Sequence, residues 1–89
     1  MSKYACPCCG YQTFDEEPTG DYIICPVCFW EDDPIQKQDP TYAGGANRVS
    51  LKQGQQNYVA FGACEPEMKR HVRKPNLDEP KDPDWRPVD

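Results

Sequence analysis

The sequence is short of the residues that usually build a hydrophobic core. Leu, Ile, Val and Phe together account for about 15% of the 89 residues: two Leu, three Ile, five Val and three Phe. A share below about 20% in a chain with appreciable net charge is typical of disordered proteins. A domain this small also gains only marginal stability from apolar burial. The chain therefore needs another source of folding free energy.

The sequence also lacks a membrane span, a signal segment and an excess of basic residues, and each absence argues against a class of protein. The longest apolar run, Tyr22 to Trp30, is far too short to cross a bilayer, so we expect no membrane association. No apolar signal segment precedes the first cysteine, so we expect a reducing, cytoplasmic location. Ten Lys and Arg face fifteen Asp and Glu, giving a net charge of −5. Because nucleic-acid binding needs a basic footprint, we expect no nucleic-acid partner.

What the chain has instead is cysteine, six in all, and four of them stand at two matching places. The segments Cys6–Cys9 and Cys25–Cys28 both read C-P-x-C, and an aromatic residue follows each within two positions. Two C-x2-C pairs separated by fifteen residues have the spacing of a zinc site. We predict one structural Zn2+ bound by Cys6, Cys9, Cys25 and Cys28. Its binding, on the order of 10–16 kcal/mol in zinc-finger peptides, would supply the missing folding free energy.

The residues within each pair favour a tight turn. Proline at the second position fixes φ at about −65°. Gly10, after the first pair, permits the positive φ that turns backbone N–H groups toward a thiolate. Phe29 stands at the matching place in the second turn and lacks that freedom. Cys8 aligns with Val27, so we expect it not to be a ligand; an exchange with a cysteine of its own turn is the alternative.

Two other uses of cysteine stay open at this point. Six cysteines in a secreted chain could form three disulfides, although the missing signal segment disfavours secretion. The segment Cys25–Cys28 alone resembles a thioredoxin-type C-P-x-C, and Cys8 with Cys64 could form a redox pair. Such chemistry places the first cysteine at a helix N-terminus, and no βαβ pattern surrounds the motif. A thiol–disulfide redox protein is therefore the enzymatic alternative. A zinc ribbon that binds nucleic acid is a further, non-enzymatic alternative.

The two turns and their flanks predict a small metal-stabilised α+β fold built on a zinc-ribbon β-hairpin. Strand formers flank both turns, and the polar segment Asp15–Gly20 separates them. Residues 35–45 read as a polar loop. Ser50 and Gln53 fit a capping box, and an apolar face predicts a helix that ends at Gly62.

A second, shorter helix should begin near Pro66 and end before Pro75. The basic cluster Lys69–Lys74 would complement the dipole at its end, and the single histidine, His71, is not expected to bind the metal. We divide the chain into one domain, residues 1–75, and an extended Pro-rich tail, residues 76–89. Trp85 could attach that tail to the body of the protein.

The remaining signals concern a partner. Four thiolates leave no open metal position for catalysis, so a non-enzymatic role is favoured. Two acidic runs, Asp15–Glu17 and Glu31–Asp33, would attract a basic protein; the alternative is that they only keep the chain soluble. Aromatic residues favoured at interface centres are also present, namely Trp30, Tyr42 and Trp85. We expect the chain to bind an unidentified protein.

With these residues laid out, the chain resembles the bacterial cysteine-rich CPCC family, which takes its name from the motif Cys6-Pro7-Cys8-Cys9. The resemblance spans about residues 5–75 and extends well beyond the cysteines. It also includes Gly10-Tyr11, Cys25 to Asp33, Gly45-Ala46-Asn47, Ser50-Leu51, Gln55, Asn57, Phe61 to Cys64, Val72-Arg73 and Pro75. It supports the expected architecture and implies no particular biochemical activity.

Overall fold

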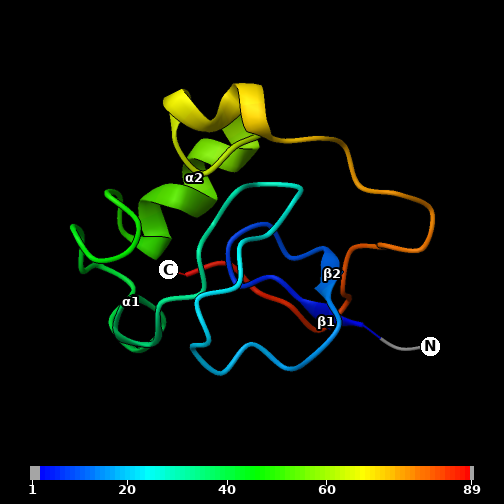
Figure 1. Ribbon diagram of the computed structural model, residues 1–89, viewed down its shortest axis with the longest axis horizontal. Coiled ribbons are helices and arrows are strands. Elements are labelled where there is room, and N and C mark those ends of the chain that lie inside the picture. Colours follow the sequence, from blue (N-terminus) through cyan, green and yellow to red (C-terminus); the bar gives the residue numbers. More distant parts are fainter. Residues whose placement is uncertain (1–2, 89) are drawn as a thin grey trace.

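The computed structural model describes residues 3–88 and joins a small hairpin to helices. Strands β1 (Tyr4–Ala5) and β2 (Gln12–Phe14) pair antiparallel on either side of the first C-P-x-C turn. Helix α2 (Leu51–Phe61) and the 3-10 helix η1 (Pro66–His71) lie together on the other side of the molecule (Figure 1). The expected small α+β fold with a two-stranded hairpin is confirmed.

The second C-P-x-C turn has its own short pairing. The Tyr22 amide donates to the Asp32 carbonyl (3.0 Å), and the Asp32 amide donates to the Ile23 carbonyl (3.0 Å). An isolated bridge joins Ile24 to Glu31. Backbone pairing therefore runs across each turn separately. The polar segment 15–20, which we expected between paired strands, instead connects two independently bonded units.

Residues 35–45, expected as a polar loop, contain the short helix α1 (Pro34–Gln38). Asp33 begins it, because its Oδ1 accepts hydrogen bonds from the amides of Ile35 (2.8 Å) and Gln36 (3.2 Å). Proline at the first helical position adds a second start signal. The buried Gln36 amide then donates to three backbone carbonyls of the following loop, those of Tyr42, Asn47 and Val49. A buried amide thus organises a segment that composition alone marks as irregular.

Helix α2 begins and ends where the sequence predicts. Ser50 Oγ accepts from the Gln53 amide (3.0 Å), and Gly62 closes the helix with φ of 84°. A Cβ at Gly54, in the middle of the helix, would lie 3.2 Å from Cys8 Sγ and 3.3 Å from the Trp30 ring. The glycine therefore lets α2 lie directly on the two C-P-x-C turns, Cys6–Cys9 and Cys25–Cys28, which we call the first and second metal turns.

The second, shorter helix begins at Pro66 as predicted, but it ends earlier than expected. It is the 3-10 helix η1, and it ends at His71 rather than just before Pro75. Val72 is already extended, with φ of −105° and ψ of 163°. The Arg73 amide then reaches the Pro26 carbonyl (3.3 Å) in the second turn. The chain leaves the helix early because this segment lies against the second metal turn.

The C-terminal segment runs back along the first turn and β2, and ends beside α2 (Figure 1). Pro80 accepts a hydrogen bond from the Gln12 amide (2.9 Å), and the Asp82 amide donates to the Gly10 carbonyl (2.8 Å). Trp85 Nε1 donates to the Pro7 carbonyl (3.0 Å). The expected attachment through Trp85 is confirmed.

Cysteine is the main residue type of the core. The buried cluster contains ten residues among those described, and six of them are cysteines. The others are Phe14, Val27, Trp30 and Leu51. This composition explains how a chain with so few aliphatic side chains can have an interior at all.

Candidate metal centre

The two C-P-x-C turns have the same backbone hydrogen bonds. In the first, the Cys6 amide donates to the Tyr11 carbonyl (2.9 Å), and the Gly10 amide donates to the Cys6 carbonyl (2.9 Å). In the second, the Cys25 amide donates to the Trp30 carbonyl (2.9 Å), and the Phe29 amide to the Cys25 carbonyl (2.8 Å). The sequence repeat is therefore a structural repeat.

Both turns also require a left-handed residue at the same place. Gly10 has φ of 79°, and Phe29 has φ of 69°. A phenylalanine in this region carries backbone strain, whereas a glycine does not. The second turn adopts the geometry despite its residue type.

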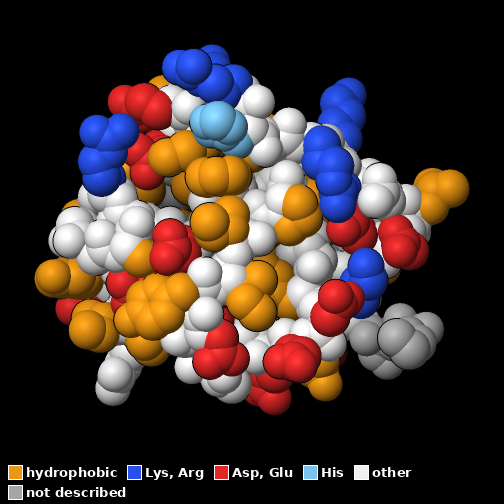
Figure 2. Space-filling view, in the orientation of Figure 1, with side chains coloured by type: hydrophobic (Ala, Val, Ile, Leu, Met, Phe, Trp, Pro, Cys, Tyr) orange, Lys and Arg blue, Asp and Glu red, His pale blue; other side chains and the backbone are white. Residues whose placement is uncertain are grey.

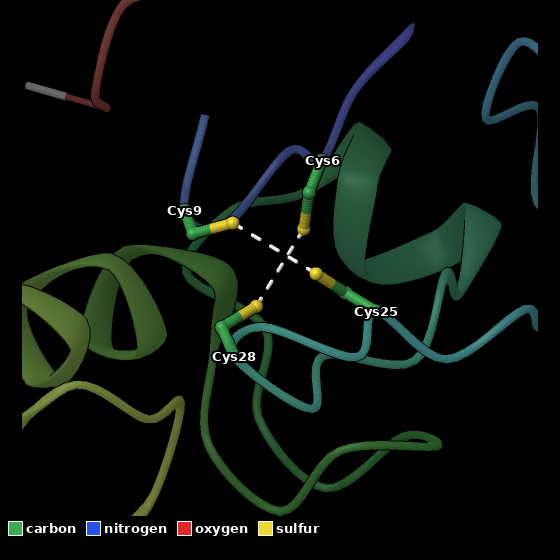
Figure 3. A group of neighbouring side chains, drawn as sticks. All are labelled: Cys6, Cys9, Cys25 and Cys28. Carbon is green, nitrogen blue, oxygen red and sulfur yellow. Dashed lines mark hydrogen bonds between the residues drawn. The ribbon is translucent and has the colours of Figure 1, made fainter. Parts of the chain in front are cut away.

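These turns bring all four predicted ligands to one point (Figure 3). The Sγ atoms of Cys6 and Cys28 are 3.6 Å apart, and those of Cys9 and Cys25 are 3.8 Å apart. All four sulfurs lie within 4.8 Å of one another. In a regular tetrahedron with metal–sulfur bonds of about 2.3 Å, the sulfurs are separated by about 3.8 Å. The four cysteines could therefore hold a metal ion in tetrahedral geometry.

The centre is closed off from solvent. All four cysteines are at most 1% exposed. Within residues 3–88 all six cysteines are free thiols, and Cys8 and Cys64 are buried outside the four-sulfur group. His71 also lies outside it and instead stacks on Phe29, with ring centroids 5.1 Å apart. The four cysteines of the two C-x2-C pairs therefore form one group, and Cys8, Cys64 and His71 lie outside it.

Electrostatics show why such a cluster needs a cation. Burial raises the pKa of the Cys6 and Cys28 thiols well above the ordinary value. Hydrogen bonds from the thiols of Cys28, Cys6 and Cys9 lower the pKa of Cys25. Burial therefore disfavours the charged thiolate form at Cys6 and Cys28, whereas hydrogen bonds favour it at Cys25. Four buried thiolates together would need a bound cation, and a divalent ion would reduce their charge of about −4 to about −2.

Two further groups donate hydrogen bonds to the sulfurs or lie within reach to do so. The Cys8 amide donates to Cys6 Sγ (3.4 Å), and Thr13 Oγ1 lies 3.2 Å from Cys25 Sγ. Hydrogen bonds of this kind orient ligands and stabilise the thiolate form. Sequence reasoning missed Thr13 as part of the centre, since nothing in its neighbourhood sets it apart from an ordinary strand residue.

The run Glu31–Asp33 is not an acidic surface, contrary to expectation. Asp32 and Asp33 are 1% and 5% exposed. Asp32 Oδ2 accepts from the Gly20 amide (2.8 Å). Hydrogen bonds from backbone amides, first of all that of Ala46 (2.9 Å), lower the pKa of Asp33. These carboxylates fasten loops beside the second turn.

The three aromatic residues that we expected at an interface differ in how much of each side chain is exposed. Trp30 is fully buried between the metal turns and α2, so it cannot contact a partner. Tyr42 is 44% exposed, and Trp85 is half-buried against the first turn. Only Tyr42 of the three is free for contact over much of its surface.

Among the curated proteins, none matches the chain. Within residues 3–88, no helix is long and apolar enough to span a membrane. The sequence model of the family described as Cysteine-rich CPCC matches residues 4–79, which include both metal turns and both longer helical segments. The chain belongs to the cysteine-rich CPCC family.

Proposed function

We propose that the protein is a zinc-ribbon-like module in which Cys6, Cys9, Cys25 and Cys28 bind one structural Zn2+. The observation that carries this proposal is the match between the sulfur separations of 3.6 and 3.8 Å and the edges of a tetrahedron of four sulfurs around zinc. Two turns with identical hydrogen bonds, each presenting one cysteine pair, support it further. A buried set of four thiolates suits Zn2+ or iron, and zinc is favoured as the usual metal of structural sites with four cysteine ligands.

Metal analysis together with native mass spectrometry tests the metal. We expect one zinc per chain, and we expect chelation to abolish the helical circular dichroism signal. Iron in the purified protein, or a folded metal-free chain, would refute a structural zinc.

A non-enzymatic role follows from the same donor set. Four thiolates complete tetrahedral coordination and leave no position for a reacting water. A dithiol enzyme is disfavoured, because Cys25 lies in a turn well before α1 begins at Pro34 and is fully buried. Thiol titration of the native zinc-loaded protein should find almost no fast-reacting group, since Cys8 and Cys64 are also only 1% exposed. Two fast thiols from the Cys25–Cys28 pair would favour the redox alternative.

We further propose that the module acts in the cytoplasm by binding another protein. Three consecutive apolar residues, Tyr22, Ile23 and Ile24, are 51%, 47% and 43% exposed, directly before the second metal turn. Figure 2 shows hydrophobic side chains gathered on one face, with acidic side chains beside them. Clustered apolar exposure marks interaction sites. The exposed run Asp15–Glu17 and the net charge of −5 favour a partner with a basic surface.

The charge distribution disfavours nucleic acid as that partner. Within the basic cluster, Arg73 is already paired with Glu79 (2.7 Å). Outside it, Arg48 is paired with Glu65 (3.3 Å) and Glu67 (3.5 Å). The fifteen Asp and Glu outnumber the ten Lys and Arg, and the resulting net charge of −5 opposes contact with phosphate. Fluorescence anisotropy at about 150 mM salt should show no sub-micromolar binding to DNA or RNA.

Site-specific photo-crosslinking tests the protein-binding surface. A photo-crosslinking residue at Ile23 should capture a protein in cells, and the same residue at the fully exposed Leu77 should not. Replacing Asp15, Glu16 and Glu17 by Asn or Gln should weaken capture and its salt dependence. Equal capture at both positions, or none at Ile23, would reject this surface.

A further inference from the structure

A pocket of about 330 Å³ lies between α2 and the C-terminal segment, beside the first metal turn. Cys8 and Cys9 contribute to its lining from the metal turn, and Trp85, Pro87 and Val88 contribute from the C-terminal segment. The pocket is held in shape, because Gln55 of α2 donates to the Pro7 carbonyl (2.9 Å) and accepts from the Val88 amide (2.7 Å). Its size is at the lower end of the range for small-molecule sites.

The lining is largely apolar and aromatic. Tyr58 and Val59 line it from α2, and Trp85 and Val88 line it from the C-terminal segment. Val59 is 86% exposed although it is aliphatic and lies in a helix that buries other side chains. An apolar side chain left open beside a preformed pocket is available to cover a ligand.

Two lysines border the pocket in a chain that is otherwise acidic. Lys52 comes from α2 and Lys81 from the C-terminal segment. Within residues 3–88 neither forms an ion pair, whereas Lys3, Arg48 and Arg73 do. The Lys81 ammonium is held 4.9 Å from the centre of the Tyr11 ring and 4.7 Å from that of Trp85. An apolar cavity with local positive charge fits a ligand with the opposite charge and an apolar body.

We propose that this pocket binds a small aromatic carboxylate. The aromatic body would pack among Trp85, Val88 and Val59, and the carboxylate would meet Lys52 and Lys81. This site adjoins the four-cysteine group through Cys9, but its ligand would contact the lysines and aromatic side chains rather than the metal. Tyr22, Ile23 and Ile24 are not part of its lining. It would make the module a small-molecule binder in addition to a protein binder.

The test uses the full-length zinc-loaded protein and 3-phenylpropionate as the probe. Titration followed by 1H–15N NMR should shift the Trp85 indole signal more than that of the buried Trp30. The neutral amide of the same acid should bind at least about tenfold more weakly, because it cannot pair with an ammonium. Equal binding of acid and amide, or no shift at millimolar acid, would overturn the proposal.

Exposed-site variants separate binding from folding. Val59→Glu places a negative charge at the pocket without disturbing the interior, and it should weaken binding about tenfold or more. Lys81→Met keeps the aliphatic contact with the rings and should weaken binding about threefold to tenfold. Lys74→Met, at an exposed lysine away from the pocket, is the matched control and should change nothing. Binding that persists in Val59→Glu and Lys81→Met would place the acid elsewhere.

An aromatic carboxylate could also be the C-terminal phenylalanine of a polypeptide, and a peptide with that C-terminus distinguishes the two sources. The pocket predicts that the free acid binds at least as tightly as the peptide. If only the peptide binds, and only with a free C-terminus, the pocket recognises the C-terminus of a polypeptide and the small-molecule assignment is wrong.

Discussion

The two metal turns share one hydrogen-bond pattern but differ in what holds them. The first turn has Gly10 at the left-handed position, and a Cβ added there would lie only 2.6 Å from the Trp85 ring. The second has Phe29 there, and its ring stacks on His71. The first turn gains its support by leaving room for a distant side chain. The second gains it by carrying a side chain of its own, at the cost of backbone strain.

The largest effect should come from removing one ligand of either turn. Cys9→Ser and Cys28→Ser should each abolish zinc binding and unfold the chain, since zinc binding contributes on the order of 10–16 kcal/mol in comparable sites. Native mass spectrometry and circular dichroism measure both outcomes. Cys8→Ala is the control and should retain one zinc. Loss of zinc in Cys8→Ala with retention in Cys9→Ser would reassign the ligand.

At Gly10, an added methyl group should be poorly tolerated. Gly10→Ala should lower the free energy of unfolding of the zinc-loaded protein by about 2–4 kcal/mol, from left-handed strain plus the clash with Trp85. In a Trp85→Ala background the same change should cost only about 1 kcal/mol, because the clash is gone. Denaturant unfolding of the four proteins gives the coupling. Additive effects would mean that Trp85 does not occupy this space.

Thr13→Val tests a difference in how the ligands are oriented. Cys6 receives a backbone N–H from Cys8, whereas the Cys25 sulfur has the Thr13 hydroxyl at 3.2 Å. Valine keeps the shape and removes the hydroxyl, so zinc affinity should fall about tenfold. Competition with a chromophoric chelator measures it, with Thr41→Val, at an exposed loop residue, as the control. Unchanged affinity would limit Thr13 to packing.

The smallest effect is expected at Phe29. Phe29→Ala loses the ring and keeps the strain, whereas Phe29→Gly loses the ring and relieves the strain. We therefore expect Phe29→Gly to be more stable than Phe29→Ala by about 1 kcal/mol. Thermal unfolding of the zinc-loaded variants suffices. Identical stabilities would show that the positive φ of Phe29 carries no strain.

Much of the centre could be predicted because it depends on local chemistry. Cysteine spacing, proline and the capping residues Ser50 and Gly62 act over a few positions, and they place the ligands and α2. The burial of Asp32 and Asp33 could not be predicted, because their partners at Gly20 and Ala46 lie a dozen or more residues away. Helix α1 has local start signals at Asp33 and Pro34, but its place in the fold depends on the buried Gln36, which bonds to the carbonyls of the following loop.

These differences from expectation have a common physical cause. A carboxylate run looks the same in sequence whether water or backbone amides solvate it. Only the tertiary fold brings the amides of Gly20 and Ala46 to these side chains. The same holds for η1, whose end is set by a contact between Arg73 and Pro26 rather than by Pro75.

The hydrogen bond from Trp85 to Pro7 spans 78 positions of the sequence. A chain growing on the ribosome can pair its cysteines once Cys28 has emerged, but the cover over the first turn arrives only with residues 80–88. The second turn receives its support earlier, from Cys64 and Arg73. Long loops close slowly because their ends must first meet. We therefore expect the first turn, although it is synthesised first, to be the last to be covered, with Cys6 and Cys9 accessible to other metals and to oxidants until residues 80–88 have been made.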